Sequence, residues 1–304
     1  MRRSIPRRAV LLAALGVAAM ATPGAASAQA RRGGGLDQSR TRPAPAPAAR
    51  RAAPTPPRLD AVRPADDRTF RPTVVIRRGK SQGTGTIIAT SADSSLVLTA
   101  AHVVRDRGDL VVELHRYNVG LEKSRGGDWP LVIPAEVVGT DDAGDVALLR
   151  LRGPSPLPFV ARLYDDDPAG LAPGALVTSL GVDQGARVAS WETGLVETAR
   201  FRIEDDGEER PFLVTMKIPA HGRSGGGLFL ADGRLVGVCV GHAEMYQGRR
   251  MGIFASLASA RRLIRKHGLD AEVARSQARP PAPAASRRGG QAVESEAAPR
   301  YDRS

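Results

Sequence analysis

The sequence predicts an all-β fold, and three features of residues 73–255 indicate it. Short runs rich in Val, Ile, Leu and Thr recur, and Gly, Pro and Asp separate them, as in strands joined by turns. A Gly- and Pro-rich break at residues 153–158 divides the runs into two sets. The only helical pattern follows the last run. The number of strands by itself is compatible with either a β-barrel or a β-sandwich.

The two sets of expected strands are similar in size. The first set covers residues 73–77, 84–89, 95–99, 110–115, 131–139 and 146–151. The second set covers residues 175–181, 187–192, 194–203, 211–217, 227–231, 235–240 and 250–255. A helix is expected over residues 256–267, because Ser256 is a suitable N-cap and Gly268 a suitable C′ residue. Its apolar face carries Leu257, Ala260, Leu263 and Ile264.

The N-terminal segment has the pattern of an export signal at residues 1–28. Four arginines precede an apolar run of 12 residues, Ala9 to Met20, which is too short to span a bilayer. Small residues at Ala26 and Ala28 provide a cleavage site. We therefore expect an exported protein, periplasmic or extracellular. An uncleaved anchor is the alternative, and the paired arginines leave both Sec and twin-arginine routes open.

The flanks of the folded region have low complexity. Residues 29–68 are rich in Pro, Ala and Arg, and residues 269–304 have a similar composition, so both are expected to be disordered. The formal charge of +12 lies in residues 1–65 and 276–304, since residues 66–275 carry 27 basic and 27 acidic side chains. No nucleic-acid partner is expected from a neutral folded part. The basic arms either contact an anionic wall or membrane surface weakly, or serve only as solvated linkers.

Three sequence patterns suggest acyl-transfer chemistry. Ser224 lies in the turn Gly222-Arg223-Ser224-Gly225-Gly226, between two apolar strands, where glycines allow close approach of a substrate and leave amide groups to point into one hollow. His102 ends the apolar run that begins at Leu96, and Asp145 opens the run 146–151. The order His, Asp, Ser is that of the chymotrypsin-type triad.

With these motifs the sequence resembles the trypsin-like serine peptidases, and most closely the HtrA/Deg-like bacterial peptidase domain. The resemblance covers residues 70–267 and rests on four motifs: Thr99-Ala100-Ala101-His102-Val103, Asp145-Val146-Ala147-Leu148-Leu149, Gly222-Arg223-Ser224-Gly225-Gly226 and Gly252-Ile253-Phe254-Ala255. It implies two six-stranded antiparallel barrels with the site between them. The peptidase domain would span 69–268, with barrel one at about 69–152 and barrel two at about 171–255.

The resemblance also implies a role for each site residue. Ser224 would attack a carbonyl, His102 would take its proton as general base, and Asp145 would orient the imidazole. The N–H groups of Gly222 and Ser224 would form the oxyanion hole. No cofactor and no metal is expected, because the remaining histidines show no ligand spacing. A polypeptide is the expected substrate.

The expected S1 pocket is apolar. In trypsin-type enzymes an Asp six residues before the nucleophile selects Lys or Arg, and here that position holds Ile218. We expect a buried Ile218 at the pocket floor, and the opposite wall is expected from Cys239, Val240, Gly241 and His242. A small or medium aliphatic P1 side chain is then predicted.

The chain departs from the family pattern in three places. Arg223 stands where relatives have Asp or Asn, Gly227 replaces a frequent Pro, and no PDZ module is expected after the helix. An Asp before the serine pairs with a freed N-terminal ammonium in trypsin-like zymogens, so Arg223 predicts activity without proteolytic trimming. Alternatives remain: a catalytically inactive, protein-binding barrel, and an esterase for small esters.

Overall fold

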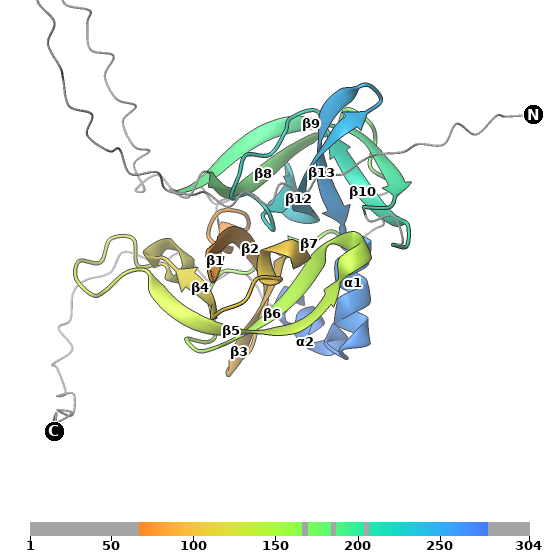
Figure 1. Ribbon diagram of the computed structural model, residues 1–304. Coiled ribbons are helices and arrows are strands. Elements are labelled where there is room, and N and C mark those ends of the chain that lie inside the picture. Colours follow the sequence, from red (N-terminus) through yellow and green to blue (C-terminus); the bar gives the residue numbers. More distant parts are fainter. Residues whose placement is uncertain (1–66, 166–169, 184–186, 204–206, 279–304) are drawn as a thin grey trace, which may run out of the picture.

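Two β-barrels and two C-terminal helices make up the described part of the chain. The computed structural model describes residues 67–165, 170–183, 187–203 and 207–278. Figure 1 shows the barrels packed against each other, with both helices beside the barrel formed by the first half of the chain. The predicted all-β class and the two six-stranded antiparallel barrels are confirmed. The expected signal and most of both expected disordered segments lie outside the described residues.

Barrel one is a closed antiparallel sheet with the strand order β1-β2-β3-β6-β5-β4. Its strands are β1 (Thr73–Arg78), β2 (Ser81–Thr90), β3 (Ser94–Thr99), β4 (Leu110–Leu114), β5 (Leu131–Asp141) and β6 (Val146–Arg152). Each of them matches one expected strand within a few residues. Short 3-10 turns follow three of these strands: η2 (Ala101–Val104), η3 (Arg116–Val119) and η4 (Asp142–Gly144).

Barrel two closes because β11 pairs with both β8 and β12. Its strands are β8 (Leu176–Asp183), β9 (Arg187–Phe201), β10 (Arg210–Thr215), β11 (Gly227–Leu230), β12 (Arg234–Tyr246) and β13 (Arg249–Ser256). A two-residue strand that we did not predict, β7 (Arg162–Leu163), pairs with β12 in parallel. The two strands expected at 187–192 and 194–203 are one strand, β9, because it pairs along its length first with β8 and then with β10.

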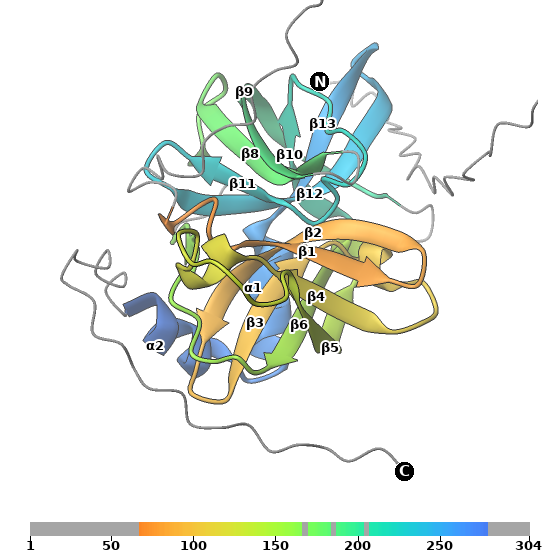
Figure 2. The same ribbon diagram turned by 90° about the vertical axis from the view of Figure 1, so that its left-hand side faces the viewer.

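Adjacent residues of a strand point to opposite faces of the sheet. One face therefore packs inside a barrel, and the other packs in the hydrophobic layer between the barrels. Ile87 of β2 packs inside barrel one, whereas its neighbour Ile88 packs in the layer between the barrels with Phe212 and Val214. The interior of barrel two holds a smaller cluster that includes Phe254. Figure 2 shows β1 and β2 of barrel one directly below barrel two. Loops from both barrels therefore meet along this contact.

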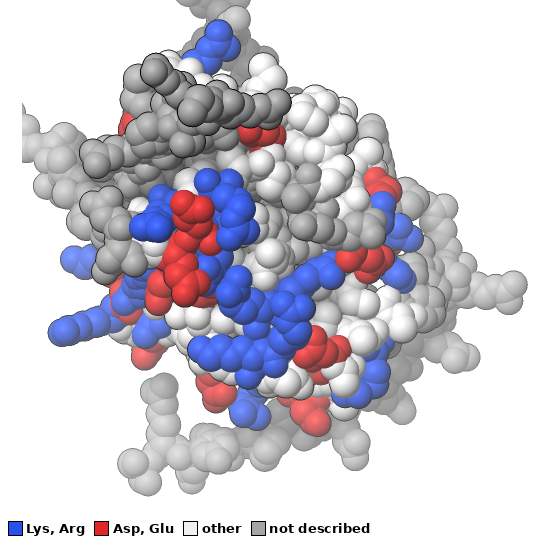
Figure 3. Space-filling view, turned by 90° about the vertical axis from the view of Figure 1, so that its right-hand side faces the viewer, with Lys and Arg blue, Asp and Glu red and all other residues white. Residues whose placement is uncertain are grey.

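Helix α1 (Leu257–Lys266) begins as expected, with the Ser256 hydroxyl accepting a hydrogen bond from the Ala258 N–H. His267 is its C-cap residue. Within the described ranges, neither helix is long and apolar enough to cross a bilayer. On the face that Figure 3 presents, a band of Lys and Arg side chains lies between groups of Asp and Glu side chains.

The prediction of disorder from residue 269 onward is wrong for helix α2 (Asp270–Ala278). Low-complexity composition led to that prediction, but Leu269 and Val273 are buried against the hydrophobic layer. The Ser276 hydroxyl accepts a hydrogen bond from the Thr90 N–H at 2.9 Å. The Gln277 side chain donates to two backbone carbonyls and accepts from the Leu163 N–H.

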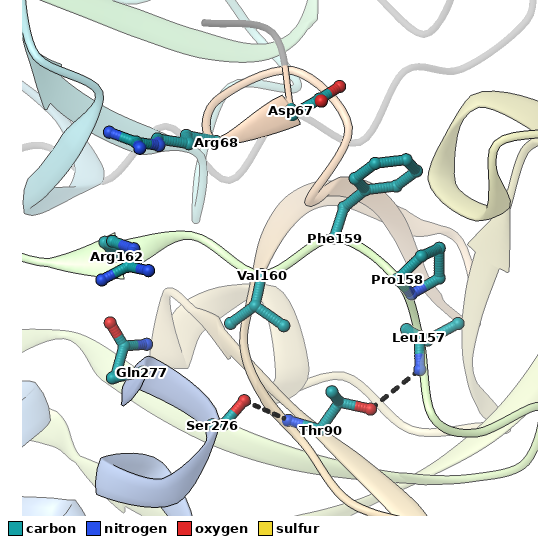
Figure 4. Close-up of a pocket in the computed structure, with 10 residues that line it drawn as sticks. All are labelled: Asp67, Arg68, Thr90, Leu157, Pro158, Phe159, Val160, Arg162, Ser276 and Gln277. Atoms are coloured by element: carbon teal, nitrogen blue, oxygen red, sulfur yellow. Dashed lines mark hydrogen bonds between the residues drawn. The ribbon is translucent and has the colours of Figure 1, made fainter. Parts of the chain in front are cut away.

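Figure 4 shows where α2 meets the rest of the chain. A small cavity of about 30 Å³ separates Ser276 and Gln277 of α2 from the segment 157–160 that joins the barrels and from the beginning of the described chain, Asp67 and Arg68. The cavity can hold only a water-sized group. It therefore marks a packing junction.

Candidate active site

Asp145 and His102 are joined by direct hydrogen bonds. The Asp145 carboxylate accepts from the His102 ring Nδ1 at 2.5 Å and from the His102 backbone N–H at 2.9 Å. The Asp145 carbonyl also accepts from the Ala101 N–H. Because an ionised carboxylate only accepts hydrogen bonds, Nδ1 carries the proton and Nε2 presents its lone pair. This is the tautomer that a general base needs.

The backbone at Asp145 is adapted to this position. Asp145 follows η4 in the left-handed conformation, with φ of 51° and ψ of 47°. Asp and Asn adopt this conformation at lower cost than other non-glycine residues. Its side chain is 4% exposed, whereas the His102 side chain is 28% exposed. The buried acid thus orients an imidazole that solvent and substrate can reach.

Two other acids, Asp141 and Asp142, stand close to Asp145 in the chain and are further candidates for the triad acid, but both have other partners. Asp141 is buried and pairs with Arg210 at 3.2 Å, which is a structural ion pair between barrel one and β10. Asp142 is exposed and pairs with Arg105. Only Asp145 contacts His102 among the three candidates.

Ser224 lies in the turn between β10 and β11, at the contact between the barrels. Gly222 and Gly225 have φ of 93° and 83°, which favours glycine at both positions. A side chain at Gly225 would collide with the Thr84 carbonyl and the Thr99 hydroxyl of barrel one. A Cβ on Gly83 would likewise lie 3.0 Å from the Ser224 carbonyl and within 2.7 Å of Val103. The structure therefore brings the serine turn against the turn that carries His102.

Hydrogen bonds fix the orientation of the peptides around Ser224. The Arg223 carbonyl accepts from the Gly226 N–H at 2.8 Å, and the Gly222 carbonyl accepts from the Thr84 hydroxyl at 2.7 Å. Because a trans peptide points its N–H opposite to its carbonyl, the first bond also sets the direction of the Ser224 N–H. Within the part of the chain that the structure describes, the N–H groups of Gly222 and Ser224 donate no hydrogen bond.

Thr84 is a site residue that the sequence analysis missed. Its N–H donates to the Ser224 carbonyl at 2.8 Å, and its hydroxyl donates to Gly222 and accepts from the Val182 N–H at 2.9 Å. The only sequence signal is its place between two glycines, Gly83 and Gly85, both of which pack too closely for a side chain. Glycines flanking a polar residue in a strand indicate close approach of another backbone.

The structure separates the residues expected to line S1. Cys239 is fully buried in the interior of barrel two, so the expectation that its side chain forms a pocket wall is wrong. Its backbone instead holds the serine turn, because its carbonyl accepts from the Gly225 N–H and its N–H donates to Gly226. Burial raises the pKa of the Cys239 thiol, so the thiol stays protonated. Val240 is also buried.

Ile218 differs from the expectation of a buried floor residue, since it is 37% exposed. Gly241 faces open space: an added Cβ would meet no atom within 4 Å. The next residue, His242, has its Nε2 within 2.7 Å of Glu244 and 2.9 Å of Arg250, and the His242 bond lowers the pKa of the Glu244 carboxyl. Gly241 of β12 therefore faces open space, and Glu244 adds a charge farther along the same strand.

The geometry defines a class of protein. Two closed antiparallel barrels, with an Asp-bound histidine and a glycine-flanked serine turn at their contact, are typical of chymotrypsin-type hydrolases. The family model described as trypsin-like peptidase domain matches residues 83–238, about half of the chain. The chain belongs to this family.

The individual relatives agree with this assignment. Serine protease HTRA1 of Xenopus tropicalis is 28% identical over 161 residues, which are 52% of this chain and 31% of the relative. A probable periplasmic DegP-like serine endoprotease of Pseudomonas putida (strain GB-1) is 33% identical over 162 residues, which are 53% of this chain and 29% of the relative. The chain thus spans about a third of the length of these relatives.

Solved structures support the fold. The active form of the Rv3671c protease from M. tuberculosis is 24% identical, with a TM-score of 0.53 over 67% of this chain and 84% of that one. The HtrA-type protease AlgW, solved with a tripeptide, is 21% identical, with a TM-score of 0.51 over 68% of this chain and 63% of that one. At these identities the likeness shows the fold alone.

Proposed function

We propose that the chain is an exported serine endopeptidase that hydrolyses peptide bonds through an acyl-enzyme. The hydrogen bond from His102 Nδ1 to Asp145 Oδ2 carries the proposal, because it leaves Nε2 as the ring nitrogen with a free lone pair, and the close packing at Gly83 brings the His102 turn and the Ser224 turn together. Ser224 would attack the scissile carbonyl while Nε2 takes its proton. The same proton then passes to the leaving amine. Water, activated in the same way, releases the acid and regenerates the serine.

The oxyanion would be bound by the N–H groups of Gly222 and Ser224. Neither donates elsewhere in the described chain, and the carbonyl of the Arg223–Ser224 peptide is held by the Gly226 N–H. Donors that are oriented before the reaction stabilise a developing negative charge without reorganisation. This preorganisation, together with all three triad residue types, favours catalysis over an inactive binding module.

An extended polypeptide fits the site better than a nucleic acid. Beyond Val238, β12 pairs only with β13 in the described chain, so the edge from Val240 to His242 is available for an added strand. Such an edge binds the backbone of unfolded or exposed segments. Residues 66–275 carry 27 basic and 27 acidic side chains, so the folded part lacks the net positive charge that is typical of a nucleic-acid-binding domain.

The proposed location rests on the basic and apolar pattern of residues 1–28. Relatives described as periplasmic, among them the DegQ endoprotease of Escherichia coli (strain K12), agree with it. Cleavage of the signal, rather than its use as an anchor, is part of the proposal. The basic segment 29–66 would then precede the folded domain in the mature protein.

Labelling with a fluorophosphonate probe tests the function. We expect the wild type to be labelled and to digest unfolded casein. Ser224→Ala should abolish labelling and leave only a residual rate of casein hydrolysis, about a thousand-fold above the uncatalysed rate in water. Ser190→Ala, at an exposed serine of β9, is the matched control and should behave like wild type.

Three other outcomes would reject parts of the proposal. Undiminished casein digestion by Ser224→Ala would show that another residue is the nucleophile. Hydrolysis of a nitrophenyl ester without cleavage of casein would restrict the activity to small esters. Binding of unfolded casein by a wild type that takes up no probe would favour the inactive binding module.

A further inference from the structure

Arg223 lies between the two proposed oxyanion donors, and its side chain is completely buried. All five of its N–H donors have acceptors. Nε and Nη2 donate to the two carboxylate oxygens of Asp183 at 2.5 and 2.9 Å. Nη1 donates to the carbonyl and hydroxyl of Ser179 at 3.0 and 3.2 Å, and Nη2 also donates to the Ala189 carbonyl at 3.0 Å. The guanidinium carbon lies 4.9 Å from the centre of the Trp191 ring.

These partners come from the hairpin of β8 and β9. The hairpin provides space for the arginine at Gly181, where a Cβ would lie 3.0 Å from the Arg223 Cγ. A fork of two parallel N–H···O bonds fixes direction as well as distance, which a single ion contact does not. Arg223 is therefore anchored by its side chain to barrel two, while Thr84 of barrel one holds the carbonyls of Gly222 and Ser224.

We propose that the Arg223–Asp183 pair is the device that keeps the oxyanion turn in its active form, which makes Arg223 and Asp183 positioning residues of the catalytic site. The inference rests on the proposed serine-peptidase function. Both partners are internal to the folded chain. The turn is accordingly held by residues of the folded domain itself, and no freed N-terminal ammonium is required.

The pair also reverses the usual charge arrangement. The cation is on the serine turn and the anion is on the hairpin, whereas the turn carries the anion in trypsin-like zymogens. A buried guanidinium needs a fixed counter-charge, because an unpaired buried cation is strongly unfavourable. Loss of the Asp183 charge should therefore displace Arg223 and, with it, the peptides on both of its sides.

Asp183→Asn is the main test, because Asp183 is partly exposed and asparagine keeps its shape. A leucine-containing peptide nitroanilide provides kcat and KM separately. We expect kcat to fall about a hundred-fold, as for a small misplacement of catalytic groups, with KM almost unchanged. The inhibition constant of a peptide boronic acid, which needs the oxyanion hole, should rise in parallel.

Asp232→Asn is the matched control, since Asp232 forms an exposed pair with Arg234 in the turn between β11 and β12. It should keep wild-type kcat. Burst titration counts the active sites in each variant. If Asp183→Asn were only partly unfolded, its burst amplitude would be lower, but the rate per active site would equal that of the wild type. That result would overturn the inference, because it assigns the pair a purely structural role.

Chemical rescue gives an independent readout. Arg223→Ala should have a low kcat that millimolar methylguanidinium restores and methylammonium does not, because only the former can form the fork with Asp183. Equal kcat in Asp183→Asn, Asp232→Asn and wild type, or no rescue of a folded Arg223→Ala, would refute the inference while the peptidase function stands. A wild type without hydrolysis or labelling would instead refute the proposed function itself.

Discussion

The Thr84 hydroxyl donates a 2.7 Å hydrogen bond to the Gly222 carbonyl, although the two residues are 138 positions apart in the chain. The bond connects β2 of barrel one to the serine turn of barrel two. The same hydroxyl accepts from the Val182 N–H, so one side chain joins the turn to β8 as well. Both barrels are thus required for the geometry of one loop.

Replacing Thr84 with valine should impair both stability and catalysis. The Val182 N–H would be left buried without an acceptor, which costs about 1–3 kcal/mol. The Gly222 carbonyl would lose its donor, so kcat should fall as well. Thr84→Ser keeps the hydroxyl and is the control. Thermal unfolding and peptide hydrolysis measure the two effects, and equal behaviour of the two variants would contradict this role.

Asp145→Asn should abolish most activity without unfolding the protein. Asparagine tolerates the left-handed backbone and can still accept from the His102 N–H. Its amide, however, would face Nδ1 and favour the wrong tautomer, so we expect kcat to fall about 10⁴-fold. Asp142→Asn changes an exposed acid three residues earlier and should have no such effect. Similar kcat values for both variants would contradict the assignment of Asp145.

The P1 preference should be aliphatic. Ile218 offers no counter-charge to a basic side chain, and the neighbouring Lys217, whose Nζ lies 5.0 Å from the Trp191 ring centre, adds a positive charge. Cleavage sites mapped by mass spectrometry in a denatured protein should follow Val, Leu, Ile or Ala. Ile218→Asp should shift cleavage toward Lys and Arg. Cuts after Lys or Arg in the wild type would mean that another residue forms the pocket.

Truncations should separate α2 from the flanking segments. Removing residues 279–304, or residues 29–65, should leave the melting temperature and kcat unchanged, because these segments lack core-forming residues. Removing residues 270–304 also removes α2, and it leaves the Thr90 and Leu163 N–H groups without their acceptors. We expect the free energy of unfolding to fall by at least about 2 kcal/mol.

The same N-terminal truncation tests activation. If the full chain were inactive and became active only after its N-terminal segment is cut, the expected activity without proteolytic trimming would be contradicted.

The buried thiol predicts a loss of stability at alkaline pH. Burial raises the pKa of Cys239 above that of an unfolded thiol, about 8.5. Above that pH the unfolded chain releases a proton that the folded protein retains, so the free energy of unfolding falls as pH rises. The loss from this group at pH 9.5 is about 1.4 kcal/mol relative to pH 7. Urea unfolding in the presence of a reductant should show this extra decrease in wild type and not in Cys239→Ala.

The sequence by itself determined the fold class, nearly every strand of the two barrels and the identity of the Asp–His pair. Strand composition and turn residues are local properties, and the order of His102, Asp145 and Ser224 can be read along the chain. Helix α2 was missed altogether, because its stability comes from contacts with Thr90, Leu163 and the hydrophobic layer, not from its own composition.

Only the tertiary structure decided how the serine turn is held. Thr84 is 138 positions from Gly222, and Asp183 is 40 positions from Arg223. The glycines beside Thr84 indicate a close approach of another backbone, but they do not identify that backbone. The tertiary structure also decided that the Cys239 side chain points into barrel two, because its direction depends on the pairing register of β12 with β13. Register shifts between Cys239 and Gly241 and then exposes Gly241, so strand pairing, and not residue type, set the shape of the site.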